Sequence, residues 1–450
     1  MLNLNISRIS AIAIAVASLS TGSAMAAENL YGGGATFPAQ PYVGDTYTGV
    51  TPNARLSTNA GNTAGTGFST VTLGTNQVRN PAAPPATITA NSVFLAYSNA
   101  STNKVSYCQT GSGFGKTVLA GNPDANQPCR DFSVSPLGLS AAAATPDFIA
   151  TDAPYSTADY NAFLGGDNFA SRVGVVQVPT LAGAIALPQS TPATSFNLTA
   201  AQVCQVYSGL VSDWSSVSGS TTTGPIKIVY RTDGSGTTFA FTSYLARTCN
   251  GTSNVPSGFV FSPNQTFNSA LPGGVSAVYG SRAIGASGNN GVVTSVRVTN
   301  SNALGYADVG EVLLQVAKYA TVAGFDPKNF GRDSSGNPVP VTLAAAALLS
   351  GRVLDGATVN TVPGSGTTAV KNCVRLVNPT AAITNAYPIA AITYLAGFTS
   401  GNGSAAHVQA IKDLFNIFYN TSTRPALPDG FAYLGGITAS AQNTVNTCVQ

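Results

Sequence analysis

The feature that most constrains the fold is an apolar run that ends in a glycine-rich turn and continues with helical periodicity. Residues 226–230 are mostly apolar, and Gly234 and Gly236 lie in the turn that follows them. Bulky residues then recur at helical spacing over residues 241–248, and the Asn-Gly pair at residues 250–251 ends this pattern. The segment therefore predicts a strand, a tight turn and a helix.

Two earlier stretches share this design. Residues 30–38 pass from an apolar pair through three glycines to Thr36, which can cap a helix, and residues 148–154 pass from Phe-Ile-Ala to Thr-Asp-Ala-Pro. Strands and helices that alternate in this way predict an α/β fold with mostly parallel sheets. Ligands of such sheets bind outside the carboxyl ends of the strands, so we expect all three turns to face a ligand site.

The chain carries little charge for its size. Charged residues make up 8% of its 450 residues, and the formal net charge is +3. An average soluble domain has roughly 25% charged residues. Since no run of Lys and Arg is present, the chain has no general electrostatic attraction to nucleic acid or to an anionic membrane. Any bound anion must be held by local geometry.

Residues 1–26 predict a cleaved signal peptide. Arg8 supplies a positive start, residues 11–19 are apolar, and Ala-Met-Ala at residues 24–26 offers a cleavage site. No Cys follows this site, so a lipid anchor there is not expected. No later segment approaches the ~20 apolar residues of a membrane helix. We expect a mature protein that is periplasmic or secreted.

The six cysteines of the chain predict disulfides, because an even number in an exported protein is typical of paired cysteines. They are Cys108, Cys129, Cys204, Cys249, Cys373 and Cys448. Six cysteines allow about 15 connectivities. None of them forms a C-x-x-C pair, so a zinc site is not expected. Sequential pairing is the simplest expectation. Cys204 with Cys249 is the best supported pair, since the two flank one strand-loop-helix unit.

The turn at residues 231–238 has the groups that bind a small tetrahedral anion without a metal. Such a site needs converging backbone N–H groups, short hydroxyl donors and a fixed cation. The backbone and hydroxyl donors would come from Gly234, Ser235, Gly236 and Thr237. Arg231 can reach the same anion, and Asp233 could hold its guanidinium in place. The residues alone leave a plain turn with a surface Arg–Asp pair as an equal alternative.

Residues 231–246 resemble the signature of phosphate-binding proteins that serve phosphate-specific ABC transporters, within the periplasmic-binding-protein superfamily. Residues 34–38 are similar to the N-terminal loop of that family, residues 150–154 to the loop with its phosphate-facing aspartate, and residues 111–113 to its second-loop serine. Further matches follow in the family's order at residues 288–291, 304–307 and 386–389. The resemblance covers most of the mature chain.

A second resemblance is to the DING proteins, a secreted branch of the same superfamily. It rests on residues 32–36, on residues 204–209 with Trp214, and on residues 224–226 and 248–250. In that branch, the cysteines that match Cys204 and Cys249 form a disulfide, which supports this pairing here.

This chain departs from both patterns in a long excursion over residues 48–106. The excursion is rich in Thr, Asn, Gly and Ala and is interrupted by prolines. Structureless loops of this length are uncommon in compact domains, so we expect local hairpins with a strand over residues 92–97.

The resemblance implies an α/β, two-lobed periplasmic-binding-protein fold of type II, with the ligand in the cleft between the lobes. It places the first lobe at residues 27–187 with a return over residues 388–450, and the second lobe at residues 188–387. It also implies the phosphate contacts, which are Thr36, Phe37, Ser112, Asp152, Arg231, Ser235, Gly236 and Thr237, with Asp233 in support.

Asp152 is the informative member of this set. A carboxylate that faces an anion looks unfavourable because like charges repel. Phosphate near neutral pH still carries a proton, however, and an ionised Asp can only accept a hydrogen bond. Sulfate has no proton to offer, so the carboxylate would exclude it. A turn or helix-capping Asp before the Ala-Pro pair at residues 153–154 is the alternative interpretation.

These observations predict an exported, high-affinity binder of inorganic phosphate for capture and uptake. We expect a monomer without cofactor or metal, with an ABC importer complex as a candidate partner and no nucleic acid. A secreted phosphatase with the same anion pocket is the main alternative. Metal-dependent phosphatases need clustered Asp, Glu and His, whereas the single histidine, His407, lies on an amphipathic helical pattern around residues 405–419 and suggests a structural role. An adhesion protein should show repeats, and none of regular period is present.

Overall fold

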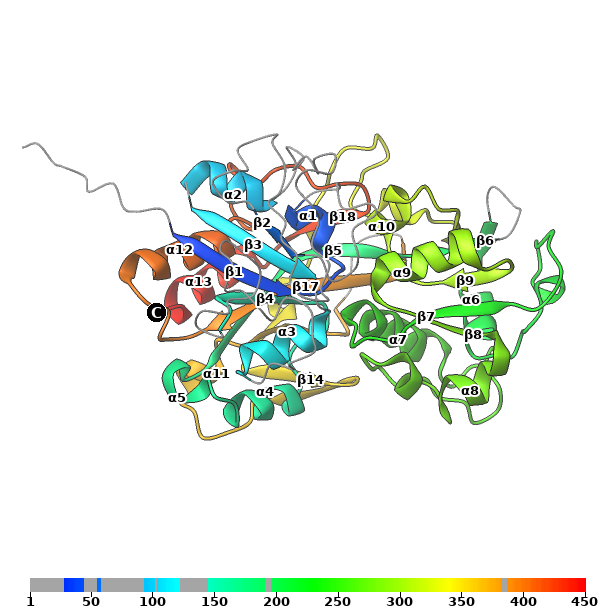
Figure 1. Ribbon diagram of the computed structural model, residues 1–450, viewed down its shortest axis with the longest axis horizontal. Coiled ribbons are helices and arrows are strands. Elements are labelled where there is room, and N and C mark those ends of the chain that lie inside the picture. The colour runs from blue at the N-terminus through cyan, green and yellow to red at the C-terminus, as the bar shows by residue number, and fades with distance from the viewer. Residues whose placement is uncertain are drawn as a thin grey trace, which may run out of the picture.

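The computed structural model describes residues 28–43, 55–57, 93–101, 103–109, 111–121, 145–190, 196–381 and 387–450. These residues form two α/β lobes, which Figure 1 shows on either side of the view. The first lobe is built on a mixed sheet that holds both the first strand and the last strand of the described chain, and the second on a three-stranded parallel sheet. The predicted α/β, two-lobed fold is confirmed.

The sheet of the first lobe is organised by β1 (Asn29–Gly34). It lies between two parallel neighbours, β3 (Lys104–Gln109) and β4 (Phe148–Thr151). β17 (Ala390–Phe398) runs antiparallel to β4 and to β5 (Val175–Pro188), so the C-terminal part of the chain returns to this sheet. The sheet is completed by β2 (Arg55–Ser57), β18 (Phe431–Gly435) and β12 (Val341–Thr342). Because β1, β3 and β4 are parallel, their carboxyl ends lie at one edge.

The sheet of the second lobe has β7 (Lys227–Arg231) at its centre, parallel to both neighbours. These neighbours are β8 (Ala283–Ala286) and β9 (Ala303–Gly305). The helix α7 (Gly236–Cys249) follows β7 after the glycine-rich turn, so the predicted strand, turn and helix are confirmed. Phe241 of α7 is buried and packs against Tyr207 and Tyr306, with ring centroids 4.7 and 4.6 Å apart, so the apolar face of the helix lies in the core.

One long strand, β5, links the two lobes. All of its residues are buried, as expected for a strand that is covered on both faces. Its last residues pair with β10 (Ala307–Asp308) and β11 (Tyr319–Val322), beyond the part that pairs with β17. β11 also pairs with β6 (Phe196–Leu198). The strand therefore carries the chain from the first sheet to the second lobe.

Residues 341–377 fall within the predicted second lobe but pack on elements of the first. β12 pairs with β18, and the hairpin of β14 (Arg352–Asp355) and β15 (Thr358–Thr361) lies beside α4 (Thr157–Leu164). The backbone N–H at the start of α4 donates to a carboxylate oxygen of Asp355 at 2.8 Å. These contacts favour a return to the first lobe earlier than residue 388, and the lobe boundaries remain a proposal.

The prediction of a strand over residues 92–97 is wrong, because residues 93–97 lie in the helix α2 (Val93–Ser101). Phe94 packs against Tyr42, Tyr107 and Phe148, with ring centroids 4.9, 5.9 and 5.7 Å apart. Local strand preference is weaker than the burial of an aromatic side chain against other elements, so tertiary packing decides this segment. Most of the remaining excursion, where hairpins were predicted, lies outside the described residues.

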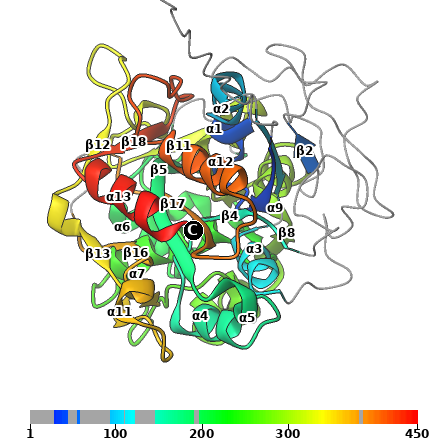
Figure 2. The same cartoon turned by 90° about the vertical axis from the view of Figure 1, so that its left-hand side faces the viewer.

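The other helices cover the sheets. The first lobe carries α1 (Ala39–Val43), α3 (Ser112–Leu119), α5 (Phe169–Arg172), α11 (Thr368–Lys371), α12 (Ala405–Asn416) and α13 (Thr438–Cys448). The second lobe carries α6 (Ala200–Tyr207), α8 (Gly274–Tyr279) and α9 (Gly288–Thr294), and α10 (Val309–Leu314) follows β10. The strands β13 (Leu348–Ser350) and β16 (Arg375–Val377) form a separate pair. Figure 2 shows α12 and α13 side by side on the outer face of the first lobe.

Two disulfides join the described elements. Cys204 of α6 pairs with Cys249 of α7, and Cys373 pairs with Cys448 at the end of α13, as sequential order predicted. The third predicted pair includes Cys129, which lies outside the described residues, as does the predicted signal peptide over residues 1–26. Among the described helices, none combines the length and the apolar character that crossing a membrane would require.

Candidate functional site

The predicted turns meet where the two lobes face each other. Gly113 of α3 donates its backbone N–H to the carbonyl oxygen of Gly234 at 3.3 Å, which connects the lobes directly. A Cβ atom added to Gly236 would lie 2.4 Å from Ser112 Oγ and 2.7 Å from Asp152 Oδ2. Only glycine therefore fits at the start of α7, because the first-lobe side chains come so close to its backbone.

Arg231 supplies a fixed positive charge at the carboxyl end of β7. Its side chain is 1% exposed. Nε donates to Asp233 Oδ1 at 2.7 Å, Nη2 forms a second bond to the same carboxylate, and Nη1 donates to Asn289 Oδ1 at 2.9 Å. Burial alone would raise the pKa of Asp233, but the Arg231 guanidinium and backbone hydrogen bonds, including that of Gly288, together hold the pKa below its usual value. A buried guanidinium needs such a paired, hydrogen-bonded carboxylate.

The N-terminus of α7 supplies hydrogen-bond donors beside this charge. Ser235 caps the helix, since its Oγ accepts from the backbone N–H of Thr238 at 3.1 Å. Gly236 and Thr237 open the helix, so their N–H groups have no partner within it and lie at the positive end of the helix dipole. Ser235, Gly236 and Thr237 are all buried. This combination is well suited to an anion.

Asp152 brings a carboxylate to the same place from the carboxyl end of β4. It is 3% exposed, and its Oδ1 accepts from Thr393 Oγ1 at 2.6 Å. Within the described chain, its buried Oδ2 has no hydrogen-bond partner. Burial raises the pKa of Asp152 to about 7, although the Thr393 bond and the charge of Arg231 both act to lower it. Asp152 therefore offers a carboxylate oxygen with lone pairs left for a ligand, beside the donors at the start of α7.

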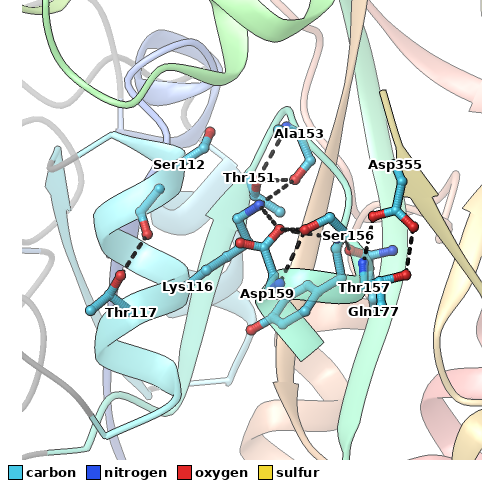
Figure 3. A network of polar contacts seen from close by, with 12 residues as sticks. Ser112, Lys116, Thr117, Thr151, Ala153, Ser156, Thr157, Asp159, Gln177 and Asp355 are labelled. Carbon is cyan, nitrogen blue, oxygen red and sulfur yellow. Dashed lines mark hydrogen bonds and ion pairs between the residues drawn. The ribbon is translucent and has the colours of Figure 1, made fainter. Parts of the chain in front are cut away.

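Ser112 and the Asp152 loop are held together by polar contacts, of which Figure 3 shows those of Lys116 with Asp159 and Ala153. Ser112 Oγ accepts from the backbone N–H of Asp152 at 3.1 Å. One turn along α3, buried Lys116 forms an ion pair with Asp159 at 2.5 Å and donates to the carbonyl oxygen of Ala153 at 3.4 Å. The ion pair lowers the pKa of Asp159 against the opposing effect of burial. α3, the loop after β4 and α4 are thus fixed to one another.

Thr36 and Phe37 complete the first-lobe side of the site. Thr36 Oγ1 accepts a hydrogen bond from Asn289 Nδ2 at 3.2 Å across the lobes. The ring of Phe37 is buried and meets the ring of Phe431 edge to face at 5.5 Å. Its side chain therefore belongs to the core, which leaves only its backbone to serve a ligand. All nine residues predicted for the site lie in this region.

Sequence reasoning missed Asn289, Thr393 and Tyr306. Asn289 contacts Arg231, and Thr393 contacts Asp152. Tyr306 Oη accepts from the backbone N–H of Arg231 at 3.2 Å, which steadies the end of β7. The motifs at residues 288–291 and 304–307 marked two of the three as part of a family pattern but gave them no role. Nothing in the local sequence marked Thr393.

Two other features lie around the site. A cavity of about 440 Å³ adjoins Asp152 and is lined by α7 and β17 residues such as Phe239 and Ile392. His407, on α12, lies between Glu28 at 2.9 Å and Asp147 at 2.8 Å, apart from the anion site. Across the described part of the chain, no group of three His, Cys, Asp or Glu side chains is arranged to hold a metal ion.

The fold is that of a two-lobed α/β protein, with a buried cluster of polar groups where the lobes meet. A family model described as the PBP superfamily domain matches residues 57–395. The chain belongs to this superfamily, that of the periplasmic binding proteins.

Curated relatives match part of the chain. Alkaline phosphatase L of Pseudomonas aeruginosa is 32% identical over 204 residues, which are 45% of this chain and 48% of that protein. A protein named phosphate-binding protein, from an unknown prokaryotic organism, is 32% identical over 126 residues, 28% of this chain and 32% of that protein. The chain thus spans about half the length of these relatives or less.

Solved structures resemble most of the chain in fold. A high-affinity periplasmic phosphate-binding protein with bound phosphate has a TM-score of 0.54 and 20% identity over 93% of each chain. The ancestral soluble variant of the human phosphate binding protein has a TM-score of 0.56 and 20% identity, over 93% of this chain and 98% of that one. A phosphate-binding protein from Stenotrophomonas maltophilia has a TM-score of 0.53, 20% identity and coverage of 93% and 90%. At this identity the likeness shows the shared fold.

Proposed function

We propose that this protein binds inorganic phosphate between its two lobes. The main observation behind this proposal is that Asp152 Oδ2, a buried hydrogen-bond acceptor, lies beside the donors at the start of α7. A protonated oxyanion satisfies both, because its bare oxygens accept from the donors and its one hydroxyl donates to the carboxylate. Arg231, which lies in the second lobe, balances the negative charge of the anion.

The same geometry discriminates against sulfate. Phosphate near neutral pH carries a proton that Asp152 can accept, whereas sulfate would leave a buried, charged oxygen unpaired and repelled. An unpaired charge in a desolvated site is costly, so the exclusion is expected to be large. The names of the curated relative and of the similar structures, which are phosphate-binding proteins, support this choice of ligand.

We propose a binding function in preference to a catalytic one. Other relatives are named alkaline phosphatase L, so a phosphatase that uses this pocket is the alternative function. In the described residues, however, the side chains beside the anion site are donors and one carboxylate, and both nitrogens of His407 are engaged by Glu28 and Asp147. No activated nucleophile of the Ser-His-Asp kind is assembled from these groups.

Export and uptake complete the proposal. The predicted signal peptide over residues 1–26 and the two disulfides fit the periplasm or the cell exterior, where disulfides persist. We propose that the protein captures phosphate as a monomer and that an ABC importer complex is the candidate recipient.

Titration calorimetry of the purified protein with phosphate and with sulfate tests the binding function. We expect saturable, tight binding of phosphate with one site per chain and much weaker binding of sulfate. Absence of phosphate binding would overturn the proposal. Hydrolysis of a chromogenic phosphate monoester with divalent metal present tests the alternative, and turnover that persists through repurification would favour the phosphatase.

A further inference from the structure

The side chain of Asn289 contacts three residues of the proposed phosphate site. It lies at the start of α9 and is 2% exposed. Its Oδ1 accepts from Arg231, while its Nδ2 donates to Thr36 Oγ1 at 3.2 Å and to Thr237 Oγ1 at 3.4 Å. Thr36 belongs to the first lobe and the other three to the second. One amide therefore connects the cation, two hydroxyls and both lobes.

The chemistry of the partners fixes the orientation of this amide. A guanidinium can only donate hydrogen bonds, so the oxygen of Asn289 must face Arg231 and its NH₂ group must face the threonines. Both threonine hydroxyls consequently act as acceptors toward Asn289. A hydroxyl that accepts here still has its own hydrogen, which is directed to another acceptor.

We propose that Asn289 positions the site for an anion by making Thr36 and Thr237 donors, and that its bond to Thr36 holds the lobes closed around the ligand. This inference rests on the proposed phosphate-binding function. Without the NH₂ group, the hydroxyls would be free to rotate and to offer lone pairs to the anion. With it, both hydroxyls are left to donate to the ligand, while Asp152 Oδ2 is the acceptor.

The backbone of α9 keeps Asn289 in place independently of the ligand. The N–H of Gly288 donates to Asp233 Oδ1 at 3.0 Å, so the helix start is tied to the same carboxylate that holds Arg231. The next residue, Asn290, points elsewhere and donates to Glu311 Oε1 at 2.8 Å. Asn290 is therefore a matched control, since it has the same side chain on the same helix without a contact to the site.

The test compares Asn289→Ala, Asn289→Asp and Asn290→Ala by phosphate titration and stopped-flow dissociation. We expect Asn289→Ala to weaken phosphate affinity roughly 10- to 100-fold, mainly through faster dissociation, because hydrogen bonds to charged groups are of this strength. Asn289→Asp should bind phosphate more weakly still, although Asp has nearly the same shape as Asn. A carboxylate accepts the threonine hydrogens and repels the anion. Asn290→Ala should bind phosphate like the wild type.

Several results would contradict the inference. Asn289→Ala with the affinity and dissociation rate of the wild type would do so, and so would Asn289→Asp binding as tightly as Asn289→Ala. If the Asn289 variants lose the wild-type circular dichroism spectrum, Thr36→Val removes the acceptor instead. An unchanged dissociation rate of phosphate would then contradict the proposal that the Asn289–Thr36 bond holds the lobes closed. A wild-type protein that binds no phosphate would instead refute the proposed function itself.

Discussion

Thr393 Oγ1 donates a hydrogen bond of 2.6 Å to Asp152 Oδ1, from β17 to the residue that follows β4. The two strands are antiparallel neighbours, so the pairing of the sheet places the threonine beside the aspartate. This bond occupies one carboxylate oxygen and turns the other toward the start of α7. The sheet register thereby decides which oxygen of Asp152 is offered to a ligand.

Asp152→Asn should reduce discrimination between phosphate and sulfate more than it reduces phosphate affinity. The amide removes the repulsion of sulfate and can turn a donor toward the anion. Competition titrations of the two anions measure the ratio of affinities. An unchanged ratio would remove Asp152 from selectivity. Thr393→Val is a useful companion, since it should leave the charge of Asp152 in place and keep sulfate excluded.

Sulfate binding to the wild type should strengthen as the pH falls. Burial raises the pKa of Asp152 to about 7, so the carboxyl gains a proton below that pH and becomes a donor to a sulfate oxygen. As the pH falls toward this pKa, sulfate affinity should therefore rise by up to about tenfold per pH unit. Below the pKa, the affinity should level off. Titration between pH 5 and 9 measures this dependence. A parallel dependence in Asp152→Asn would assign it to another group.

Arg231→Ala should weaken phosphate binding by a few kcal/mol, about 2–4, because the side chain is a buried, oriented cation. Removal also leaves the Asp233 carboxylate near the anion without its partner. Lys227→Ala, at the other end of β7, is the control for loss of a positive charge and should have little effect. Calorimetry that shows equal phosphate affinity for wild type and Arg231→Ala would exclude Arg231 from the site.

Lys116→Met should destabilise the protein by roughly 2–3 kcal/mol, because it leaves the mostly buried carboxylate of Asp159 without its cation. Urea unfolding measures the change. The double variant Lys116→Met with Asp159→Leu should recover part of the loss, since the unpaired charge is gone while the cap that Asp159 provides to α4 is still missing. Equal stability of the single variant and the wild type would show that the ion pair does not fix α3.

His407→Gln should destabilise the protein at pH 6 by roughly 1–3 kcal/mol, and the loss should shrink as the pH approaches 10. The hydrogen bond to Asp147 is the main cause that raises the pKa of His407 to about 9, and Glu28 contributes despite partial burial. A folded-state pKa above the unfolded value near 6.5 means that the stabilisation is complete below that value and is lost as the pH rises through about 9. Denaturant unfolding at several pH values measures it. A loss independent of pH would indicate packing instead of charge.

Local patterns predicted those parts of the molecule whose contacts are close in sequence. The turn between β7 and α7 follows from glycines, a serine cap and helical spacing within a few residues, and the Arg231–Asp233 pair spans two positions. The segment of α2 was predicted incorrectly because its contacts are with residues that are distant in the sequence. Its conformation depends on Phe94 packing against aromatic residues of other elements, and strand preference says nothing of those partners.

The sequence by itself determined the strand-turn-helix units, the donors they carry and the acidic residue among them, because each is set by backbone conformation and side-chain chemistry at neighbouring positions. Only the tertiary structure decided how these groups work together. Asn289 meets Thr36 across 253 positions and Thr393 meets Asp152 across 241, contacts that exist only once the sheets are paired and the lobes face each other. The free oxygen of Asp152 and the donor hydroxyls of the threonines are consequences of that arrangement.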